Sequence, residues 1–216
     1  MRGEHWAIVA KTGDGKTLLV KNLIKAYRTK YPFIHTYILD SKCLGDFTSK
    51  DGPVTCSLQP PLPLREEGDL QIWQPIERTN IDLYDTYLMR ILENGKPALI
   101  VIDESKNLKD GNRYPKGYEL LLSQGRLGGM FTFTNYQEIA NGLRQGLSQA
   151  THVVGFSVLN PYDENYLRKA LKMPPKASLE RPGKHALRYI NRDTMDSPKL
   201  YSGYQELIAE LFSAKE

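Results

Sequence analysis

The segment that decides the fold reads Ala10-Lys11-Thr12-Gly13-Asp14-Gly15-Lys16-Thr17. It matches the Walker A pattern, with alanine at the position of the first glycine. An apolar run at residues 6–10 leads into it, and leucines at helical spacing follow, which is the strand–loop–helix context that the motif requires. The glycines let the backbone curl so that successive N–H groups point at phosphate oxygens, and the helix start adds its positive end. The segment therefore predicts a site for the phosphates of a nucleotide.

Individual side chains of this loop have separate expected roles. Lys16 is predicted to place its charge on the β- and γ-phosphates, and the Thr17 hydroxyl is predicted to ligate Mg²⁺. Lys11 contacts phosphate or DNA in one interpretation and is a solvated loop lysine in the other. The expected cofactors are ATP and Mg²⁺. The residues expected to bind the nucleotide are Lys11, Thr12, Gly13, Asp14, Gly15, Lys16, Thr17 and Leu18.

A second motif is an apolar run, residues 98–103, that ends in the acids Asp103 and Glu104. Such a run is typical of a parallel strand buried on both faces, which carries its last residues to the ligand-binding edge of the sheet. This is a Walker B pattern, in which Asp103 holds Mg²⁺ through water and Glu104 orients and polarises the attacking water. A dedicated water-activating acid indicates ATP hydrolysis, because small-molecule kinases must exclude water.

The remainder of the chain alternates short apolar runs with amphipathic segments. Strands are expected at residues 33–39, 70–74, 98–103, 130–134, 152–158 and 184–191. Helices are expected directly after Gly15 and at residues 82–93, 118–124, 138–145, 163–171 and 203–212. Residues 41–67, rich in proline, glycine and serine, are expected to form a long surface excursion that contains strand and helix fragments without assigned bounds. The alternation predicts an α/β fold, a P-loop NTPase of the ASCE/RecA-like type, whose mainly parallel central sheet carries helices on both faces.

Length and composition fit one globular domain. The 216 residues are 40% hydrophobic and 25% charged, so we expect a single P-loop ATPase domain, with a core at about 6–171 and an extension at 172–216. No apolar run reaches the ~18–20 residues of a membrane span. A net charge of +4 permits a nucleic-acid partner without requiring one. Cys43 and Cys56 lack metal-ligand spacing and fit free thiols in a reducing compartment, and His152 and His185 are interpreted as strand residues.

Residues 101–108 and 121–135 together resemble the FtsK/HerA superfamily of DNA-pumping ATPases. Within it, the chain is most similar to the genome-packaging ATPases of membrane-containing, double-jelly-roll viruses. The family pattern has an acidic Walker B motif, a Gly-Arg before the next strand, a Thr-Gln at the end of that strand, and a later Asn-Pro-x-Asp turn. The segments that stand in the last three places here are Gly125-Arg126, Thr134-Asn135 and Asn160-Pro161-Tyr162-Asp163.

The resemblance assigns roles to further residues. Asn135 occupies the position of a sensor glutamine that contacts the γ-phosphate and the attacking water. Asparagine is one methylene shorter, which leaves Gln137 as the alternative. Arg126 matches the arginine that is inserted into a neighbouring subunit's site, and Arg144 is a second candidate for that finger. The resemblance thus implies that the catalytic residues are Lys16, Glu104, Asn135 and Arg126.

The resemblance also implies partners. It predicts a homo-oligomeric ring, often of six subunits, that threads double-stranded DNA by its phosphate backbone in the host cytoplasm or at the packaging vertex of a virion, next to capsid vertex proteins. A basic loop could grip the backbone or could simply be solvated. Its basic residues and neighbouring tyrosines are Lys106, Lys109, Arg113, Tyr114, Lys116 and Tyr118.

Four functions are compatible with these observations. A motor that packages a viral genome is favoured because the chain has no room for the DNA-reading or membrane domains of plasmid and chromosome pumps. A protein-handling ATPase of the filamentous-phage extrusion type usually has a membrane segment, which this sequence lacks. A nucleotide-binding switch without turnover would have little use for Glu104.

Overall fold

The computed structural model describes residues 2–42, 46–111, 113–137, 144–156, 161–180 and 183–213. The chain divides into two units. The first unit contains Met1–His5 and Tyr31–Thr134, and the second contains Trp6–Lys30 and Asn135–Glu216.

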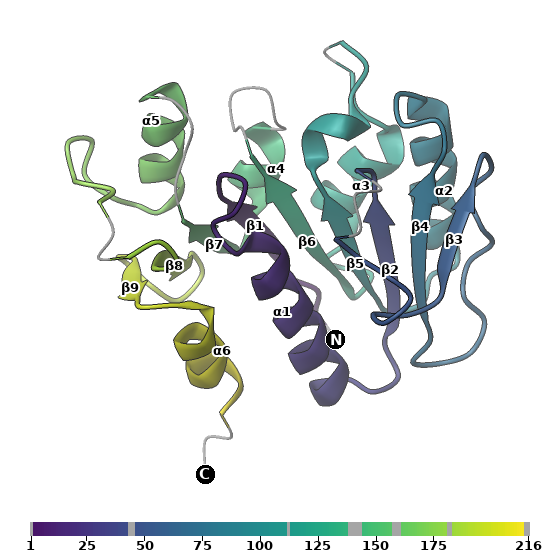
Figure 1. Ribbon diagram of the computed structural model, residues 1–216, viewed down its shortest axis with the longest axis horizontal. Coiled ribbons are helices and arrows are strands. Elements are labelled where there is room, and N and C mark those ends of the chain that lie inside the picture. Colours follow the sequence, from purple (N-terminus) through teal and green to yellow (C-terminus); the bar gives the residue numbers. More distant parts are fainter. Residues whose placement is uncertain are drawn as a thin grey trace. The chain divides into compact units, whose positions relative to one another are not determined.

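The described part of the first unit is built around parallel strands (Figure 1). Each strand pairs with the next in the order β3 (Val54–Ser57), β4 (Leu70–Pro75), β2 (His35–Asp40), β5 (Ala98–Asp103) and β6 (Met130–Tyr136). Only Met130–Thr134 of β6 belongs to this unit. The helices of the unit are α2 (Ile81–Glu93), the short 3-10 helix η1 (Ser105–Leu108) and α3 (Lys116–Gln124).

Helix α2 is fixed by aromatic packing onto the strands. Asn80 caps its N-terminus by accepting a hydrogen bond from the backbone N–H of Asp82, as its short polar side chain predicts. Tyr87 packs on Trp73 of β4 with ring centroids 4.7 Å apart, and both side chains are fully buried. The strands behind this contact are apolar, and every residue of β2 and β5 is buried. Burial of the strands on both faces is what the uninterrupted apolar run of β5 predicts.

The second unit has a mixed sheet. β1 (His5–Val9), whose residues from Trp6 onward lie in this unit, pairs in parallel with β7 (His152–Gly155). β8 (Leu187–Asn191) pairs antiparallel with β7, and β9 (Lys199–Tyr201) pairs antiparallel with β8. The helices are α1 (Lys16–Lys30), α4 (Arg144–Gln149), α5 (Pro161–Ala170) and α6 (Tyr204–Phe212).

Alternate side chains of β1 enter two different apolar layers, as the period of a strand requires. Trp6 stacks on His152 with ring centroids 4.2 Å apart, and its indole N–H donates to the hydroxyl of Tyr27 in α1 at 3.0 Å. Ala7 and Val9 belong instead to a cluster that includes residues of α4 and α5, such as Leu147 and Leu167. Strand β1 is therefore covered on both faces.

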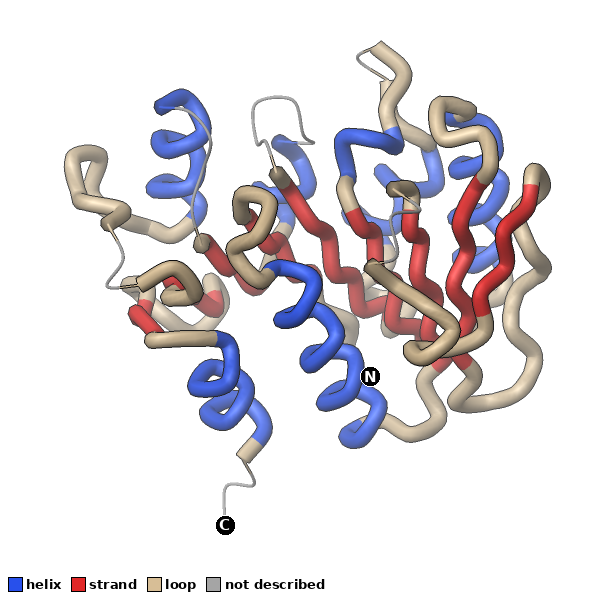
Figure 2. Tube along the Cα trace, in the orientation of Figure 1, coloured by secondary structure: helices blue, strands red, loops and turns tan. Residues whose placement is uncertain are grey.

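The fold agrees with the α/β architecture expected from the sequence, with local differences. Residues 41–67 contain the short strand β3, although the loops drawn in Figure 2 make up most of this stretch. Helix α3 begins at Lys116, two positions before the expected start, because the carbonyl of the N-cap residue Pro115 already accepts hydrogen bonds from the N–H groups of Tyr118 and Glu119. β9 was not predicted, since three residues carry too little pattern to identify a strand.

Some expected elements are only partly covered by the described residues. Of the helix expected at 138–145, residues 138–143 lie outside the described residues, and α4 continues to Gln149. The turn residue Asn160 also lies outside them, as do Cys43, Asn112 and residues 157–159. Within the described ranges, no helix has the length and apolar character needed to cross a membrane.

Candidate active site

The Walker A loop of the second unit has the backbone that its glycines predict. Gly13 has φ of +85° and Gly15 has φ of +102°, a region that residues with a Cβ atom avoid. Helix α1 begins directly afterwards, and the backbone N–H of Leu19 donates to the carbonyl of Gly15 at 3.0 Å. The first turn of α1 carries no acidic side chain, so the positive end of the helix is not neutralised there. This geometry is suited to an anion.

The side chains of the loop differ in exposure. Lys16 and Asp14 are buried, Thr17 is half-buried, and Lys11 and Thr12 are exposed. Leu18 is 48% exposed in the first turn of α1, so its side chain is not part of the core. The structure therefore brings Lys16 and Thr17 to the start of α1 together and leaves Lys11 at the surface.

A histidine from the C-terminal extension lies against this loop. The Nδ1 atom of His185 is 3.1 Å from the carbonyl oxygen of Asp14, and a Cβ atom added to Gly15 would lie 3.4 Å from the same nitrogen. The interpretation of His185 as a strand residue was wrong, because it lies in a turn before β8. His152 does lie in a strand, β7, and its Nδ1 is 2.8 Å from the hydroxyl of Tyr189.

The predicted sensor residue Asn135 is fully buried near the end of β6, in the second unit. The carbonyl of the next residue, Tyr136, accepts a hydrogen bond from the N–H of Ala10 at 3.0 Å. Asn135 thus lies one residue from a backbone contact with the first residue of the Walker A segment. The alternative, Gln137, is half-buried and follows the strand.

The two acids of the first unit lie where β5 ends. Asp103 and Glu104 are 0% and 1% exposed. Glu104 adopts φ of 76° and ψ of 81°, a left-handed conformation that costs a residue with a Cβ atom about 1–2 kcal/mol. Backbone strain of this kind is concentrated at functional sites, where the surrounding structure enforces it.

Hydrogen bonds hold the acid-bearing turn from two sides. The Ser41 hydroxyl, just beyond the end of β2, donates to the carbonyl of Asp103 at 2.8 Å. The Asn107 amide donates to the Ser41 hydroxyl at 3.2 Å, and the Asn107 backbone N–H donates to the carbonyl of Glu104 at 3.1 Å. Because β2 and β5 are paired with Asp40 opposite Asp103, this support comes from the neighbouring strand end.

A lysine that the sequence interpretation missed completes this cluster. The Lys42 ammonium is 3.3 Å from Oε2 of Glu104, 3.7 Å from Oδ2 of Asp103 and 3.8 Å from Oδ2 of Asp46, and its side chain is 14% exposed. Burial lowers the pKa of Lys42, but the three acids raise it by more, so its pKa lies above the ordinary value. These carboxylates therefore hold a positive charge next to Asp103. Carboxylate oxygens are also the ligands that Mg²⁺ prefers.

Arg126 lies at the other end of the same strands. It belongs to the turn before β6, and the first residue of β6, Met130, is paired with the first residue of β5, Ala98. Asp103 is the last residue of β5, about 16 Å further along the strand. Arg126 is half-buried, and its carbonyl accepts a hydrogen bond from the N–H of Gly3 at 2.9 Å. Arg144 is the first residue of α4, and its side chain is not among those described.

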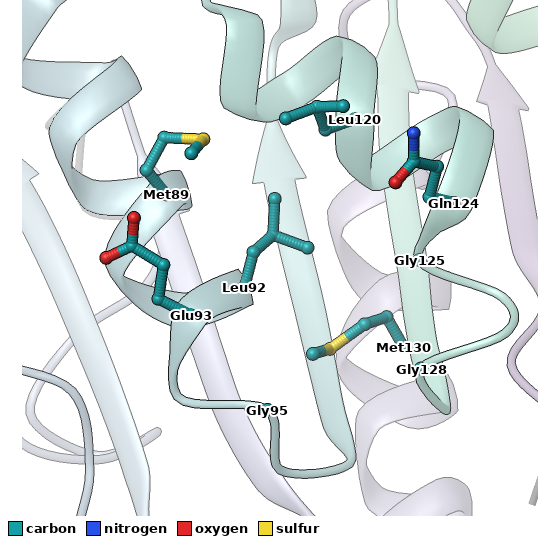
Figure 3. Close-up of a pocket in the computed structure, with 9 residues that line it drawn as sticks. All are labelled: Met89, Leu92, Glu93, Gly95, Leu120, Gln124, Gly125, Gly128 and Met130. Carbon is teal, nitrogen blue, oxygen red and sulfur yellow. The ribbon is translucent and has the colours of Figure 1, made fainter.

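An apolar cavity of about 310 Å³ adjoins this turn (Figure 3). It is lined by both ends of the Arg126 turn, Gly125 and Gly128, and by side chains of α2 and α3 such as Met89 and Leu120. The lining contains Glu93 and no basic residue, so the cavity is not suited to phosphate. The remaining lining residues are Leu92, Gly95, Gln124 and Met130.

The basic loop after Glu104 is only partly available for contacts. Arg113 and Lys116 are exposed, whereas Lys106 and Lys109 are half-buried. Asp110 and Arg113 exchange two backbone hydrogen bonds, of 3.0 and 2.9 Å, which make a tight turn. Tyr118 is fully buried, so it cannot contribute to a surface that contacts DNA.

A glycine loop that opens a helix, together with a buried strand that ends in an acid pair, defines the fold of P-loop ATPases. Comparison with solved structures agrees with this class. The genome packaging NTPase B204 from Sulfolobus turreted icosahedral virus 2, in complex with sulfate, matches with a TM-score of 0.69 and 14% identity over 94% of this chain and 98% of that one.

Two other solved structures are similar over smaller shares of their own length. The pCW3 conjugation coupling protein TcpA matches with a TM-score of 0.62 and 13% identity, over 97% of this chain and 65% of that one. The cytoplasmic domain of the Thermomonospora curvata type VII secretion ATPase EccC matches with a TM-score of 0.59 and 17% identity, over 99% of this chain and 28% of that one. No family model and no curated protein matches the sequence. The expected P-loop ATPase fold is confirmed by these likenesses.

Proposed function

We propose that this chain is an ATP-hydrolysing DNA translocase that packages a viral double-stranded DNA genome into a preformed capsid. The observation that best supports ATP hydrolysis is the position of Glu104, a buried acid in a left-handed backbone conformation directly after the strand that ends in Asp103. The packaging function is supported by B204, a genome packaging NTPase of matching length.

In the proposed reaction, Gly13, Gly15 and Lys16 bind the phosphates of ATP, and Thr17 and Asp103 would hold Mg²⁺. When bound, Mg²⁺ neutralises negative charge on the β- and γ-phosphate oxygens. Glu104 orients the attacking water and accepts its hydrogen bond, and Asn135 is the proposed γ-phosphate sensor. Structures of B204 with AMPPCP and with ATP-gammaS support ATP as the nucleotide.

The proposed motor is a homo-oligomeric ring that holds the DNA phosphate backbone. Its subunits would act in the host cytoplasm or at the packaging vertex, against capsid vertex proteins. Exposed Arg113 and Lys116 are the proposed backbone contacts, because lysine and arginine bind phosphate without reading sequence. Arg126 is the proposed finger in trans, which is supported by its position at the strand ends opposite to Asp103.

The test is steady-state ATP hydrolysis with and without linear double-stranded DNA, over a salt series. We expect DNA to stimulate turnover and the stimulation to fade as salt rises, since phosphate contacts release counterions. Glu104→Gln should bind ATP and lose about 10²-fold or more in turnover. Full turnover by Glu104→Gln would overturn the assignment of the catalytic acid.

A second candidate is a translocase for another polymer. TcpA is a conjugation coupling protein and EccC is a secretion ATPase, and this chain has the fold of both. Hydrolysis that ignores DNA at every salt concentration would favour a protein-handling ATPase. Stimulation by DNA together with transfer of plasmid DNA would favour the conjugative pump.

A further inference from the structure

Lys42 lies in the first unit between the two acids to which catalysis and metal binding are assigned above. Its ammonium is 3.3 Å from a carboxylate oxygen of Glu104, 3.7 Å from one of Asp103 and 3.8 Å from one of Asp46. The lysine follows the end of β2, and the acids follow or end the adjacent β5, so two paired strand ends place the charges together.

The cluster needs a cation for electrostatic reasons. Asp103 and Glu104 are both almost completely buried, and two adjacent buried carboxylates repel each other unless a positive charge compensates them. Lys42 supplies that charge from a side chain that is itself mostly buried. A divalent cation bound at Asp103 would meet the ammonium at close range, and the two like charges would repel.

We propose that Lys42 is a tethered competitor of the divalent cation: it holds Asp103 and Glu104 in the nucleotide-free protein, and it must leave Asp103 when the metal–nucleotide complex binds. This inference rests on the proposed function, because it takes Asp103 as the metal ligand. Lys42 is a positioning residue in this scheme, since it reaches the reaction only through the two acids. The contact with Glu104 is the shorter of the two, so Lys42 also sets the position of the catalytic acid while the metal is absent.

The first test uses the full chain and measures the Mg²⁺ concentration for half-maximal binding of a fluorescent, non-hydrolysable ATP analogue. Lys42→Met removes the competing charge, so it should lower that concentration by roughly fivefold or more. Lys42→Arg keeps the charge and can form bidentate hydrogen bonds with a carboxylate, so this variant should need a higher Mg²⁺ concentration than the wild type. Lys50→Met, an exposed lysine of the same segment, is the matched control and should match the wild type. Equal Mg²⁺ requirements in the wild type and Lys42→Met would overturn the proposal.

The second test needs no nucleotide and so separates this proposal from the proposed function. Thermal unfolding of the nucleotide-free protein is measured with and without Mg²⁺. Without Mg²⁺, Lys42→Met should unfold at a lower temperature than the wild type. Added Mg²⁺ should raise the unfolding temperature of Lys42→Met by more than that of the wild type, because the metal replaces the missing charge. Equal Mg²⁺ responses would count against Lys42 even if the protein proved to be an active ATPase. Should Lys42→Met fail to fold, Lys42→Arg still tests the proposal through the opposite change in Mg²⁺ requirement.

Discussion

Gly13 shows how a single backbone angle prepares the phosphate loop. Its φ of +85° is unfavourable for any residue with a Cβ atom, yet a Cβ atom added there would meet nothing within 4 Å. Gly13→Ala therefore tests conformation without a steric clash. We expect it to cost about 1–2 kcal/mol of loop stability and to weaken ATP binding correspondingly.

Two other glycines serve as controls for Gly13→Ala, since both also have open space around the added Cβ atom. Gly111 has φ of +57°, so Gly111→Ala should lower the free energy of unfolding without changing ATP affinity. The φ of Gly183 lies outside the left-handed region, so Gly183→Ala should change neither quantity. Isothermal titration calorimetry measures the ATP affinity of each variant, and unfolding in urea measures its free energy of unfolding. Equal ATP affinity in Gly13→Ala and the wild type would show that the φ of Gly13 does not matter for ATP binding.

His5 makes the stability of the protein sensitive to acid. Burial, followed by the nearby Arg126 guanidinium, lowers the pKa of His5 from 6.5 to about 4. A folded-state pKa below the unfolded value means that the unfolded chain binds the proton first, so stability is complete above pH 6.5 and falls as the pH drops towards 4. At pH 5 the expected loss is about 2 kcal/mol.

Urea unfolding at pH 7.5 and pH 5 measures this loss. His5→Gln cannot titrate, so its stability should change less between the two values than that of the wild type. Burial lowers the pKa of His35 as well, so part of the pH dependence should remain in His5→Gln. An undiminished pH dependence in His5→Gln would show that other groups are responsible.

At the scale of elements, the close approach of α2 and α3 depends on Gly117. A Cβ atom added at Gly117 would lie 2.9 Å from Cβ of Leu88 and 3.0 Å from the backbone nitrogen of Met89, and neither atom belongs to the end of a flexible side chain. Gly117→Ala should therefore push the helices apart and cost about 1–3 kcal/mol. Thermal unfolding measures this loss of stability. An unchanged midpoint would mean that the two helices can move apart without a loss of folding free energy.

The elements that the sequence predicts well are those whose signals are local. The Walker loop and β5 each carry their own pattern. Lys42 could not be found this way, because its partners come from β5 and no local pattern connects the two segments. Tyr118 was correctly expected in a helix, but its ring lies in the core and so cannot join the basic loop in a contact with DNA.

At the scale of the whole molecule, the candidate arginine finger can be tested by mixing inactive subunits. Arg126→Ala subunits keep their own phosphate loop, and Lys16→Ala subunits keep Arg126. If Arg126 acts on a neighbour, mixed assemblies should regain part of the DNA-stimulated ATP hydrolysis that each variant lacks, because an arginine supplied in trans is worth roughly 10³-fold or more in rate. Arg144→Ala mixed with Lys16→Ala tests the alternative finger. Mixed assembly without recovered hydrolysis would exclude Arg126 from this role.

The placement of Arg126 and Asp103 at opposite ends of parallel strands gives the first unit a front and a back. Two copies related by a twofold axis could exchange arginines only reciprocally, and such a contact closes on itself as a dimer. A head-to-tail arrangement instead passes each arginine to the next copy, and a closed ring built in this way has two faces that differ chemically. A DNA duplex within the ring proposed above would meet an entrance unlike its exit, so its two directions of travel through the ring would not be equivalent.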